Sequence, residues 1–413
     1  MKKKFTFIDL FCGIGGFHQA MTSLGGRCVF ACDIDKDCRK TYIENYGLEP
    51  EGDITKVDDT QVPDHDVLCG GFPCQAFSKA GKRLGFDDPT KGTLFFDVMR
   101  IIRAKRPKYV LLENVRNLAS HDGGNTWRVI WTSLTNSGYD VPREPVIFSP
   151  HYLGVPQHRE RVFIMGIRKD VGELPDFCFN IENLPLCSIN SIREPMVDSK
   201  YNLKDDEIAL LEHWNKFIKN TRSSEGKLPG FPVWTEWFRD ANESEYSGQP
   251  KWKQSIITKN IDYYKTNCEF IDKWLQEGKH LKLFFGSKAK FEWQVGVDDK
   301  EPEIWHNIIQ FRPSGVRVKP GTYFPALVAM VQRSIIGIRK RYMTPRECAR
   351  IQGFPDSFKL DSKEMQAYKQ FGNSVNVDVV KLFASFLMDI GDTRDRYSRD
   401  VQFPNENKTN ELF

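Results

Sequence analysis

The sequence has no apolar run long enough to cross a membrane. A membrane-spanning helix needs about 20 consecutive apolar residues, and charged residues or glycines interrupt every apolar stretch of this 413-residue chain well before that length. The start, MKKKFTFIDLF, does not read as a signal peptide either, because Asp9 and the glycines after it break its apolar part. We therefore expect a soluble, cytoplasmic protein that does not contact a membrane.

Paired cysteines with the spacing of metal ligands are also missing. The chain has ten cysteines, but Cys28, Cys32, Cys38 and Cys69 form no C-x-x-C pairs, and no histidine cluster completes a zinc site. A disulfide framework is typical of small secreted chains, whereas this chain is large and carries no export signal. We expect reduced, mostly structural cysteines and no metal site.

The chain carries little net charge. Lys and Arg number 59 and Asp and Glu 55, which gives +4 at pH 7. This is too small to attract a polyanion over the whole surface, so a nucleic-acid site would need local clustering. Residues 311–341 offer such a cluster, with seven basic residues and no acidic one. A basic run of this kind is also common on an ordinary solvated face.

Strand-like and helix-like segments alternate in the first part of the chain. Apolar, β-prone runs occupy residues 5–11, 27–35, 65–71, 108–115, 144–149 and 161–167. Segments with apolar residues at helical spacing, such as GTLFFDVMRIIRAKR, lie between them. The alternation predicts an α/β fold, with a mostly parallel sheet and helices on both faces.

This alternation is interrupted once. It holds over 1–185 and is lost over 186–335, where seven of the nine tryptophans lie. Residues 336–390 regain the earlier character, with a helix after Pro345 and a strongly apolar helix in VDVVKLFASFLMDI. We expect a second, smaller domain inserted into the first, and a polar, flexible tail over 391–413.

A glycine-rich turn follows the first expected strand. In FTFIDLFCGIGGFHQAM, Gly13, Gly15 and Gly16 allow a tight turn and close approach to a ligand. The spacing fits neither G-x-G-x-x-G nor a P-loop, and a plain strand-to-helix turn is the alternative. Asp33 ends the second strand, where a carboxylate can bind ribose hydroxyls, and Asp53 stands where a third strand would end. Together they indicate an adenosine-containing cofactor, although either acid could instead cap a helix.

A cysteine in CGGFPCQAFS lies just beyond the end of a predicted strand. Cys74 therefore stands at the sheet edge where catalytic groups gather in open α/β sheets, although a buried, inert cysteine is the alternative. YVLLENV carries Glu113 out of another buried strand, and partial desolvation would raise its pKa. In VPQHRER, Gln157, Arg159 and Arg161 alternate into a strand, so we expect them to point to one side.

These residue types form a set that suits methylation of carbon 5 of a pyrimidine. That carbon is a poor nucleophile, and attack of a thiolate at carbon 6, with an acid holding the ring nitrogen, would activate it. Carbon 5 could then accept a methyl group from a sulfonium. A base in a duplex would first have to be flipped out of the stack.

The ordered motifs resemble those of bacterial cytosine-5 DNA methyltransferases of restriction-modification type. DLFCGIGGF resembles the cofactor loop, GFPCQAFS the nucleophile loop, ENV the glutamate motif and QHRER the arginine motif. TPRECARIQGFPDSF and QFGNSV resemble the two late motifs. The resemblance implies a Rossmann-like S-adenosylmethionine-dependent domain with an inserted target-recognition domain. It also implies a monomer that acts on a specific sequence of double-stranded DNA, with a companion restriction endonuclease.

The resemblance assigns roles residue by residue. Cys74 would be the nucleophile and Glu113 its partner at the cytosine ring, with Arg159 and Arg161 contacting the base. The S-adenosylmethionine site would be lined by Asp9, Phe11, Gly13, Asp33, Ile34, Asp53, Leu94 and Asn373.

Residues that contact DNA are indicated by position alone. Ser78 lies on the loop that closes over DNA in the family. Gln310, Arg312 and Ser314 are candidates to fill the gap left by the flipped base, and Arg312 and Arg317 to bind phosphates. The sequence departs from the family pattern at Asp33-Ile34, where the usual pair is Glu followed by an aromatic residue.

Three other functions compete with this interpretation. An RNA cytosine-5 methyltransferase would use the same motifs, but the large aromatic insert favours a domain that reads a specific duplex. A non-catalytic DNA-binding regulator would not need Cys74, Glu113 and Arg159 intact. A nicotinamide-dependent oxidoreductase would explain the glycine loop and leave PCQAFS and QHRER without a role.

Overall fold

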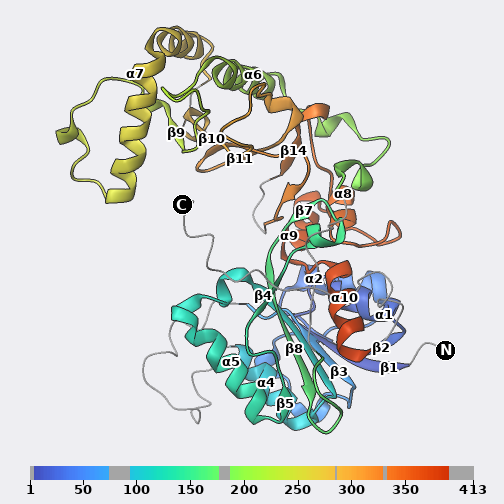
Figure 1. Ribbon diagram of the computed structural model, residues 1–413. Helices are drawn as coiled ribbons and strands as arrows, with labels where there is room; N and C mark the ends of the chain where they lie inside the picture. Colours follow the sequence, from blue (N-terminus) through green and yellow to red (C-terminus); the bar gives the residue numbers. More distant parts are fainter. Residues whose placement is uncertain (1–3, 74–93, 176–186, 284–285, 329–332, 390–413) are drawn as a thin grey trace. The chain divides into compact units, whose positions relative to one another are not determined.

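The computed structural model describes residues 4–73, 94–175, 187–283, 286–328 and 333–389. These residues form two compact units (Figure 1). The first lies within Met1–Cys187, Ala326–Ala329 and Cys348–Phe413, and the second within Ser188–Pro325 and Met330–Glu347. The chain thus returns to the first unit at Cys348, whereas the sequence analysis placed this return at residue 336.

The first unit is built on a seven-stranded sheet. Its strand order is β2-β1-β3-β4-β8-β5, and β6 also pairs with β8. The pairs that join β1 to β2, β1 to β3 and β3 to β4 are parallel, whereas β8 runs antiparallel to β4, β5 and β6. The strands are β1 (Phe5–Leu10), β2 (Gly26–Cys32), β3 (Val67–Gly70), β4 (Tyr109–Val115), β5 (Tyr139–Asp140), β6 (Val146–Phe148) and β8 (Arg161–Arg168).

All six strands predicted for this unit are present. The apolar runs of β1, β3, β4 and β8 are almost continuously buried, as expected for strands that are covered on both faces. The prediction of a mostly parallel sheet is confirmed from β2 to β4, and the antiparallel β8 extends the sheet beyond it. The helices of this unit are α1 (Gly16–Ser23), α2 (Lys36–Tyr46), α4 (Leu94–Lys105), α5 (Asn125–Asn136), α9 (Glu364–Asn373) and α10 (Val377–Met388).

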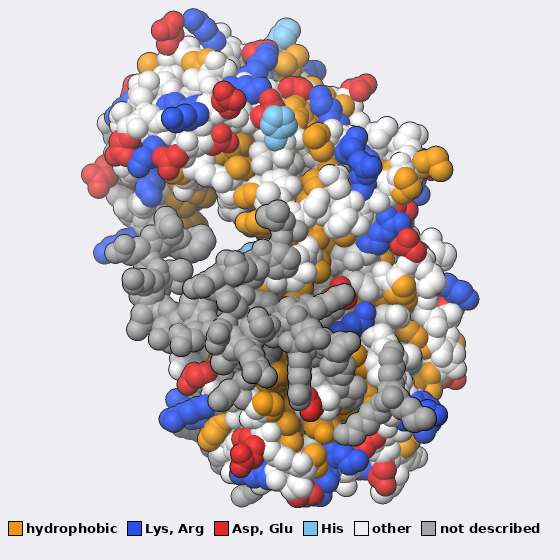
Figure 2. Space-filling view, turned by 45° about the vertical axis from the view of Figure 1, so that its right-hand side comes forward, with side chains coloured by type: hydrophobic (Ala, Val, Ile, Leu, Met, Phe, Trp, Pro, Cys, Tyr) orange, Lys and Arg blue, Asp and Glu red, His pale blue; other side chains and the backbone are white. Residues whose placement is uncertain are grey.

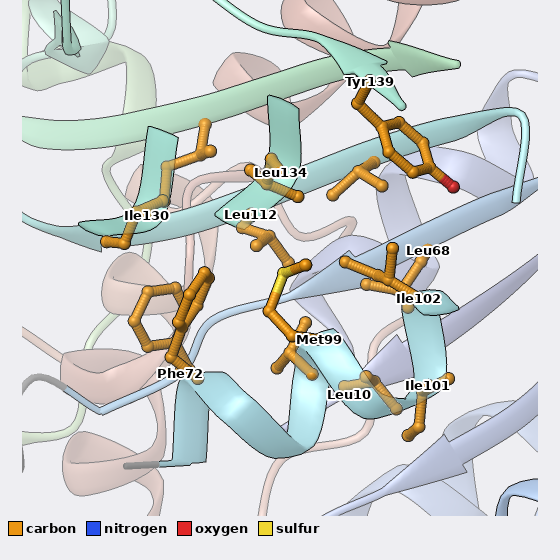
Figure 3. Packing of buried hydrophobic residues seen from close by; sticks show 14 of the residues in the cluster. Leu10, Leu68, Phe72, Met99, Ile101, Ile102, Leu112, Ile130, Leu134 and Tyr139 are labelled. Carbon is orange, nitrogen blue, oxygen red and sulfur yellow. The ribbon is translucent and has the colours of Figure 1, made fainter. Parts of the chain in front are cut away.

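Helices cover both faces of this sheet. On one face, Leu10, Leu68 and Leu112 pack against apolar residues of α4 and α5, among them Met99 and Ile130 (Figure 3). On the other face, α10 packs on α1, β4 and β8. None of the helices in the described ranges is both long and apolar enough to span a membrane.

Helix α10 is specified by a cap and by an apolar surface. The Asn376 side chain accepts the backbone N–H groups of Asp378 and Val379, both at 3.1 Å, and so caps the first turn. Phe383, fully buried, lies 4.5 Å from the ring of Phe163 and 5.3 Å from that of Phe148, between ring centroids. A segment near the end of the chain thereby joins the core of the N-terminal block.

The second unit has its own sheet and core. Its six strands have the order β15-β14-β11-β12-β10-β9. They are β9 (Val233–Trp234), β10 (Lys290–Trp293), β11 (Ile308–Arg312), β12 (Gly315–Lys319), β14 (Ser334–Ile336) and β15 (Arg341–Tyr342). The two long helices are α6 (Asp205–Asn220) and α7 (Lys251–His280). This unit also contains the short strand β13 (Phe324–Pro325). The short strand β7 (Gln157–His158) belongs to the first unit, and helix α8 (Pro345–Ile351) begins in the second unit and ends in the first.

Most tryptophans of the second unit are core residues. Trp214, Trp274, Trp293 and Trp305 are buried, and Trp214 stacks on Phe291 with ring centroids 4.8 Å apart. The aromatic enrichment that the sequence analysis took as favouring duplex reading is therefore mainly the packing of this unit.

We predict that Phe383→Ala destabilises the first unit. A buried Phe→Ala change leaves a cavity and costs about 3–5 kcal/mol. Lys381→Ala on the same helix is the control; its ion pair with Asp378 (3.6 Å) is partly exposed, so its loss costs at most about 1 kcal/mol. Hydrogen exchange of the β8 amides measures the local free energy of unfolding, and equal effects of the two changes would contradict the packing role of Phe383.

Candidate active site

The parallel strands bring several loops to one edge of the sheet. β1, β2, β3 and β4 run in the same direction and are in register near their carboxyl ends. The glycine loop after β1, Asp33 after β2, the segment Gly71–Pro73 after β3 and Glu113 near the end of β4 therefore gather at this edge. Most of the residues predicted for the site lie here.

The glycine loop leaves an open space beside it. Gly13 and Gly15 have φ of 52° and 85°, in the left-handed region that favours glycine. A Cβ atom added to Gly13 would meet no atom within 4 Å, whereas one added to Gly15 would lie 2.2 Å from the Tyr46 ring. Gly13 thus borders free space, and Gly15 allows Tyr46 to pack against the turn.

Asp33 holds the glycine loop to the end of β2. Its carboxylate accepts the backbone N–H of Gly13 at 2.8 Å through Oδ2 and that of Asp35 at 2.8 Å through Oδ1. Burial raises the pKa of Asp33, and these hydrogen bonds oppose the rise. The neighbouring Ile34 is 73% exposed, so it presents an apolar surface at the rim of the same loop.

Asp9 carries an unsatisfied buried oxygen. Its side chain is fully buried, Oδ2 accepts the N–H of His18 at 3.3 Å, and Oδ1 has no partner among the described residues. Burial raises the pKa of Asp9 well above its usual value. A buried polar atom without a partner is costly and calls for an explanation, of which a functional role is one.

The position of Asp53 differs from the prediction. The strand expected before it is a single bridge, between Glu51 and Cys32, and β3 begins only at Val67. Asp53 caps the 3-10 helix Ile54–Lys56 and accepts the backbone N–H of Thr55 at 3.0 Å and its hydroxyl at 2.8 Å. These bonds lower the pKa of Asp53. The capping role that the sequence left open is the one observed.

The late motif QFGNSV lies against the glycine loop. A Cβ atom added to Gly16 would lie 2.6 Å from Val375 and 2.9 Å from the Ser374 hydroxyl, so α1 begins in direct contact with this segment. Lys369 of α9 also pairs with Asp35 at 3.1 Å. Asn373, the last residue of α9, is exposed. The chain thus returns to the glycine loop at this late motif.

Phe11 and Leu94 are the two predicted cofactor residues that adjoin the apolar core. Both are half-buried and pack against the core cluster covered by α4 and α5. Phe11 has a φ of 55°, which turns the chain sharply at the end of β1. Phe11 thus directly follows β1, whereas Leu94 begins α4.

Glu113 and Arg161 form an ion pair beside a small pocket. Arg161 Nε lies 3.0 Å from Glu113 Oε1, because β4 and β8 pair with Val115 opposite Arg161 and Glu113 opposite Phe163. Burial raises the pKa of Glu113, and the charge of Arg161 opposes this rise. The pocket is lined by Glu113, Phe148, Pro150, Arg159, Arg161, Phe163, Asn376 and Val379.

Arg159 and Arg161 have different hydrogen-bond partners. The strand predicted through QHRER is interrupted, with β7 ending at His158 and β8 beginning at Arg161. Arg159 is buried and its guanidinium donates to three backbone carbonyls, of Leu327, Gly372 and Ser374. The single strand expected through both arginines is therefore interrupted, while both side chains line the pocket beside Glu113. Burial lowers the pKa of Arg159 to about 9, so its side chain is still charged at neutral pH.

The segment that leads to the predicted nucleophile passes Glu113. A Cβ atom added to Gly71 would lie 3.6 Å from Glu113 Oε2. Asn114 Nδ2 donates to the carbonyl of Phe72 at 2.7 Å. The sequence analysis assigned no role to Asn114. Cys74 and Ser78 lie outside the described residues.

The predicted DNA contacts of the second unit are largely engaged within it. Gln310 is buried and donates to the Ser334 hydroxyl at 3.3 Å, and Arg317 binds Glu292 through Nε and Nη2, both at 2.7 Å. Arg312 and Ser314 lie at the turn between β11 and β12, and Ser314 is exposed.

Basic residues of the acid-free run 311–341 form ion pairs with acids from outside the run. Lys340 pairs with Glu212 at 3.1 Å and Arg341 with Glu347 at 2.7 Å. The space-filling view shows basic and acidic side chains interspersed on the face that it draws (Figure 2). Together with Arg317, three of the seven basic residues of the run are thus paired with an acid.

Comparisons with known proteins identify the family. Residues 5–388 match the family described as C-5 cytosine-specific DNA methylase. The Type II methyltransferase M.HpaII of Haemophilus parainfluenzae is 38% identical over 92% of this chain and 88% of its own. M.HhaI of Haemophilus parahaemolyticus is 34% identical over 92% of each chain.

Solved structures show the same fold at low identity. The Entamoeba histolytica methyltransferase EhMeth has a TM-score of 0.54 and 17% identity, over 94% of this chain and 98% of its own. S. pombe Dnmt2 methyltransferase has a TM-score of 0.50 and 17% identity, over 93% of this chain and 98% of its own. At this identity the likeness concerns the fold alone.

We predict that Arg161→Gln raises the pKa of Glu113 further, because the removed charge stabilises the carboxylate. The control Arg116→Gln removes an exposed charge that pairs with Glu160 at 2.9 Å, and it should leave Glu113 unchanged. Infrared titration of the Glu113 carboxyl band, assigned by its loss in Glu113→Gln, measures both. Equal pKa values in wild type and Arg161→Gln would refute the coupling.

Proposed function

The chain belongs to the C-5 cytosine-specific DNA methylase family, and on that premise we propose how its residues act. The enzyme methylates carbon 5 of cytosine in DNA. We infer that the substrate is a flipped-out cytosine within a specific duplex sequence. The observation that carries this proposal is the buried Glu113–Arg161 pair, beside which the chain passes three residues before Cys74.

The protein side chains prepare the cytosine ring for methylation. The Cys74 thiolate forms a bond to carbon 6, while the Glu113 carboxyl, whose pKa burial raises, donates a proton to the ring nitrogen. The electron pair thus reaches carbon 5, which becomes the nucleophile. After the methyl group has been transferred, loss of the carbon 5 proton to a base expels the sulfur and restores the ring.

Arg161 has two effects on this step. It holds Glu113 in place, and its fixed charge moderates the rise of the Glu113 pKa, so that the acid can return to its initial state. With its remaining N–H groups it can bind the cytosine carbonyl oxygen.

The edge of the sheet offers a fit for S-adenosylmethionine, which supplies an electrophilic methyl group. Asp33 retains free lone pairs for ribose hydroxyls, and the exposed Ile34 offers an apolar surface for an adenine face. Gly13 leaves room for the ligand, and the unpartnered oxygen of Asp9 lies behind the loop. The other residues proposed to line the site are Phe11, Asp53, Leu94 and Asn373.

The partners follow from the relatives. Several are named Type II methyltransferases, and we propose that this enzyme likewise protects DNA, as a monomer, against a companion restriction endonuclease. Base flipping costs a few kcal/mol, which contacts of the second unit with DNA would offset. Ser78, Gln310, Arg312, Ser314 and Arg317 are the proposed contacts; among them the buried Gln310 would have to leave Ser334 to reach DNA.

We predict that Cys74→Ser lowers methyl transfer at least ~1000-fold, because a hydroxyl is a far weaker nucleophile than a thiolate, and leaves binding of S-adenosylhomocysteine unchanged. Cys268→Ser, at an exposed position of α7, is the control and should keep full activity. Bisulfite sequencing of a plasmid from cells that express each variant reports product and target together. Retained methylation by Cys74→Ser would exclude the covalent mechanism, as would a 5-fluorocytosine duplex that traps another residue.

We further predict that Arg312→Gln lowers the salt dependence of DNA binding by about one counterion. Arg317→Gln should leave the slope unchanged, because Glu292 already neutralises that charge. The slope of log K against log salt concentration measures both. An unchanged slope for Arg312→Gln would remove the β11–β12 turn from the proposed DNA surface.

A further inference from the structure

The guanidinium of Arg159 is committed to backbone carbonyls. Nη1 donates to Leu327 at 2.8 Å, and Nη2 donates to Gly372 at 3.1 Å and to Ser374 at 2.9 Å. Only 4% of the residue is exposed, and Nε has no acceptor among the described residues. The second arginine of the motif, Arg161, instead binds the Glu113 carboxylate.

Two of these carbonyls flank one residue. Gly372 and Ser374 lie on either side of Asn373, which is exposed at the end of α9 although both neighbours are buried. Because one nitrogen of Arg159 binds the carbonyls of the residues before and after Asn373, it fixes the orientation of the backbone that carries Asn373. The contact of Gly16 with Ser374 and Val375 places this backbone at the start of α1.

The main chain of Arg159 is also anchored. Its N–H donates to the Ser149 hydroxyl at 2.9 Å, and that hydroxyl lies 2.8 Å from His151 Nδ1. Ser149 is fully buried. Both the main chain and the guanidinium of Arg159 are therefore held by hydrogen bonds, as expected for a group whose position has to be reproducible.

The third carbonyl comes from a different part of the chain. Leu327 belongs to the short stretch Ala326–Ala329, which lies in the first unit between two stretches of the second. To reach a base or a phosphate, Nη1 and Nη2 of Arg159 would have to break three charge-assisted hydrogen bonds. Such bonds are stronger than neutral ones, so the observed arrangement opposes a direct DNA contact.

We propose that Arg159 is a positioning residue of the cofactor site, which acts through Asn373 and does not contact the flipped base. The inference rests on the proposed function, because Asn373 is assigned to the S-adenosylmethionine site there. It separates the two arginines of QHRER: Arg161 serves the cytosine, and Arg159 serves the methyl donor. It also connects cofactor binding to the segment through Leu327.

The test is the affinity for S-adenosylhomocysteine without DNA, measured by calorimetry. Arg159→Lys keeps the charge but loses the fork of donors, and it should weaken binding about tenfold. The matched control Arg161→Lys should bind as wild type does, although it loses methyl transfer. Asn373→Ala should weaken binding, and adding Arg159→Lys to it should have little further effect, because both changes disable the same contact.

Other outcomes overturn the proposal. Unchanged affinity of Arg159→Lys would do so, as would fully additive effects in the double variant. If Arg159→Lys does not fold, as judged by circular dichroism, Ser149→Ala releases only the main chain of Arg159 and should weaken binding about threefold, and unchanged affinity would count against the inference. If wild type does not bind S-adenosylhomocysteine at all, the proposed function fails first, which distinguishes the two failures.

Discussion

Parallel pairing of four neighbouring strands is the constraint on which the site depends. Strands that run in the same direction end at the same edge of the sheet. The four loops that follow β1, β2, β3 and β4 therefore lie along one edge, whatever their sequences. The loops then differ in chemistry: a glycine turn, a carboxylate, the segment before Cys74 and a buried acid. The loops lie close together because of backbone hydrogen bonding between the strands, and their side chains determine which groups they can bind.

Burial gives these polar groups their properties. An acid removed from water favours its neutral form, which raises the pKa of Asp9, Asp33 and Glu113. The three groups differ in what opposes the rise. Backbone N–H groups do so for Asp33, and the guanidinium of Arg161 does so for Glu113, while one oxygen of Asp9 has no partner among the described residues. One physical effect thus gives three acids with distinct behaviour.

Local patterns of the sequence were sufficient for the strands, the glycine turn and the late helices, because these depend on apolar spacing and on caps. Contacts between distant residues were not accessible in this way. Arg317 meets an acid 25 positions away, and the acceptors of Arg159 lie 168, 213 and 215 positions away. A basic run or an arginine motif shows which donors are present, but only the fold determines which acceptors they meet. Asp53 likewise caps a 3-10 helix where no full strand precedes it.

The packing of α10 on α1, β4 and β8 has a consequence for how the chain folds during its synthesis. During translation, the apolar face of the N-terminal sheet emerges long before the helix that covers it. Until residue 388 has left the ribosome, that face stays open to water and to chaperones, and the segment that closes the glycine turn does not yet exist. A chain that stops before Ser374 therefore lacks both the cover of this face and the contact with the glycine turn.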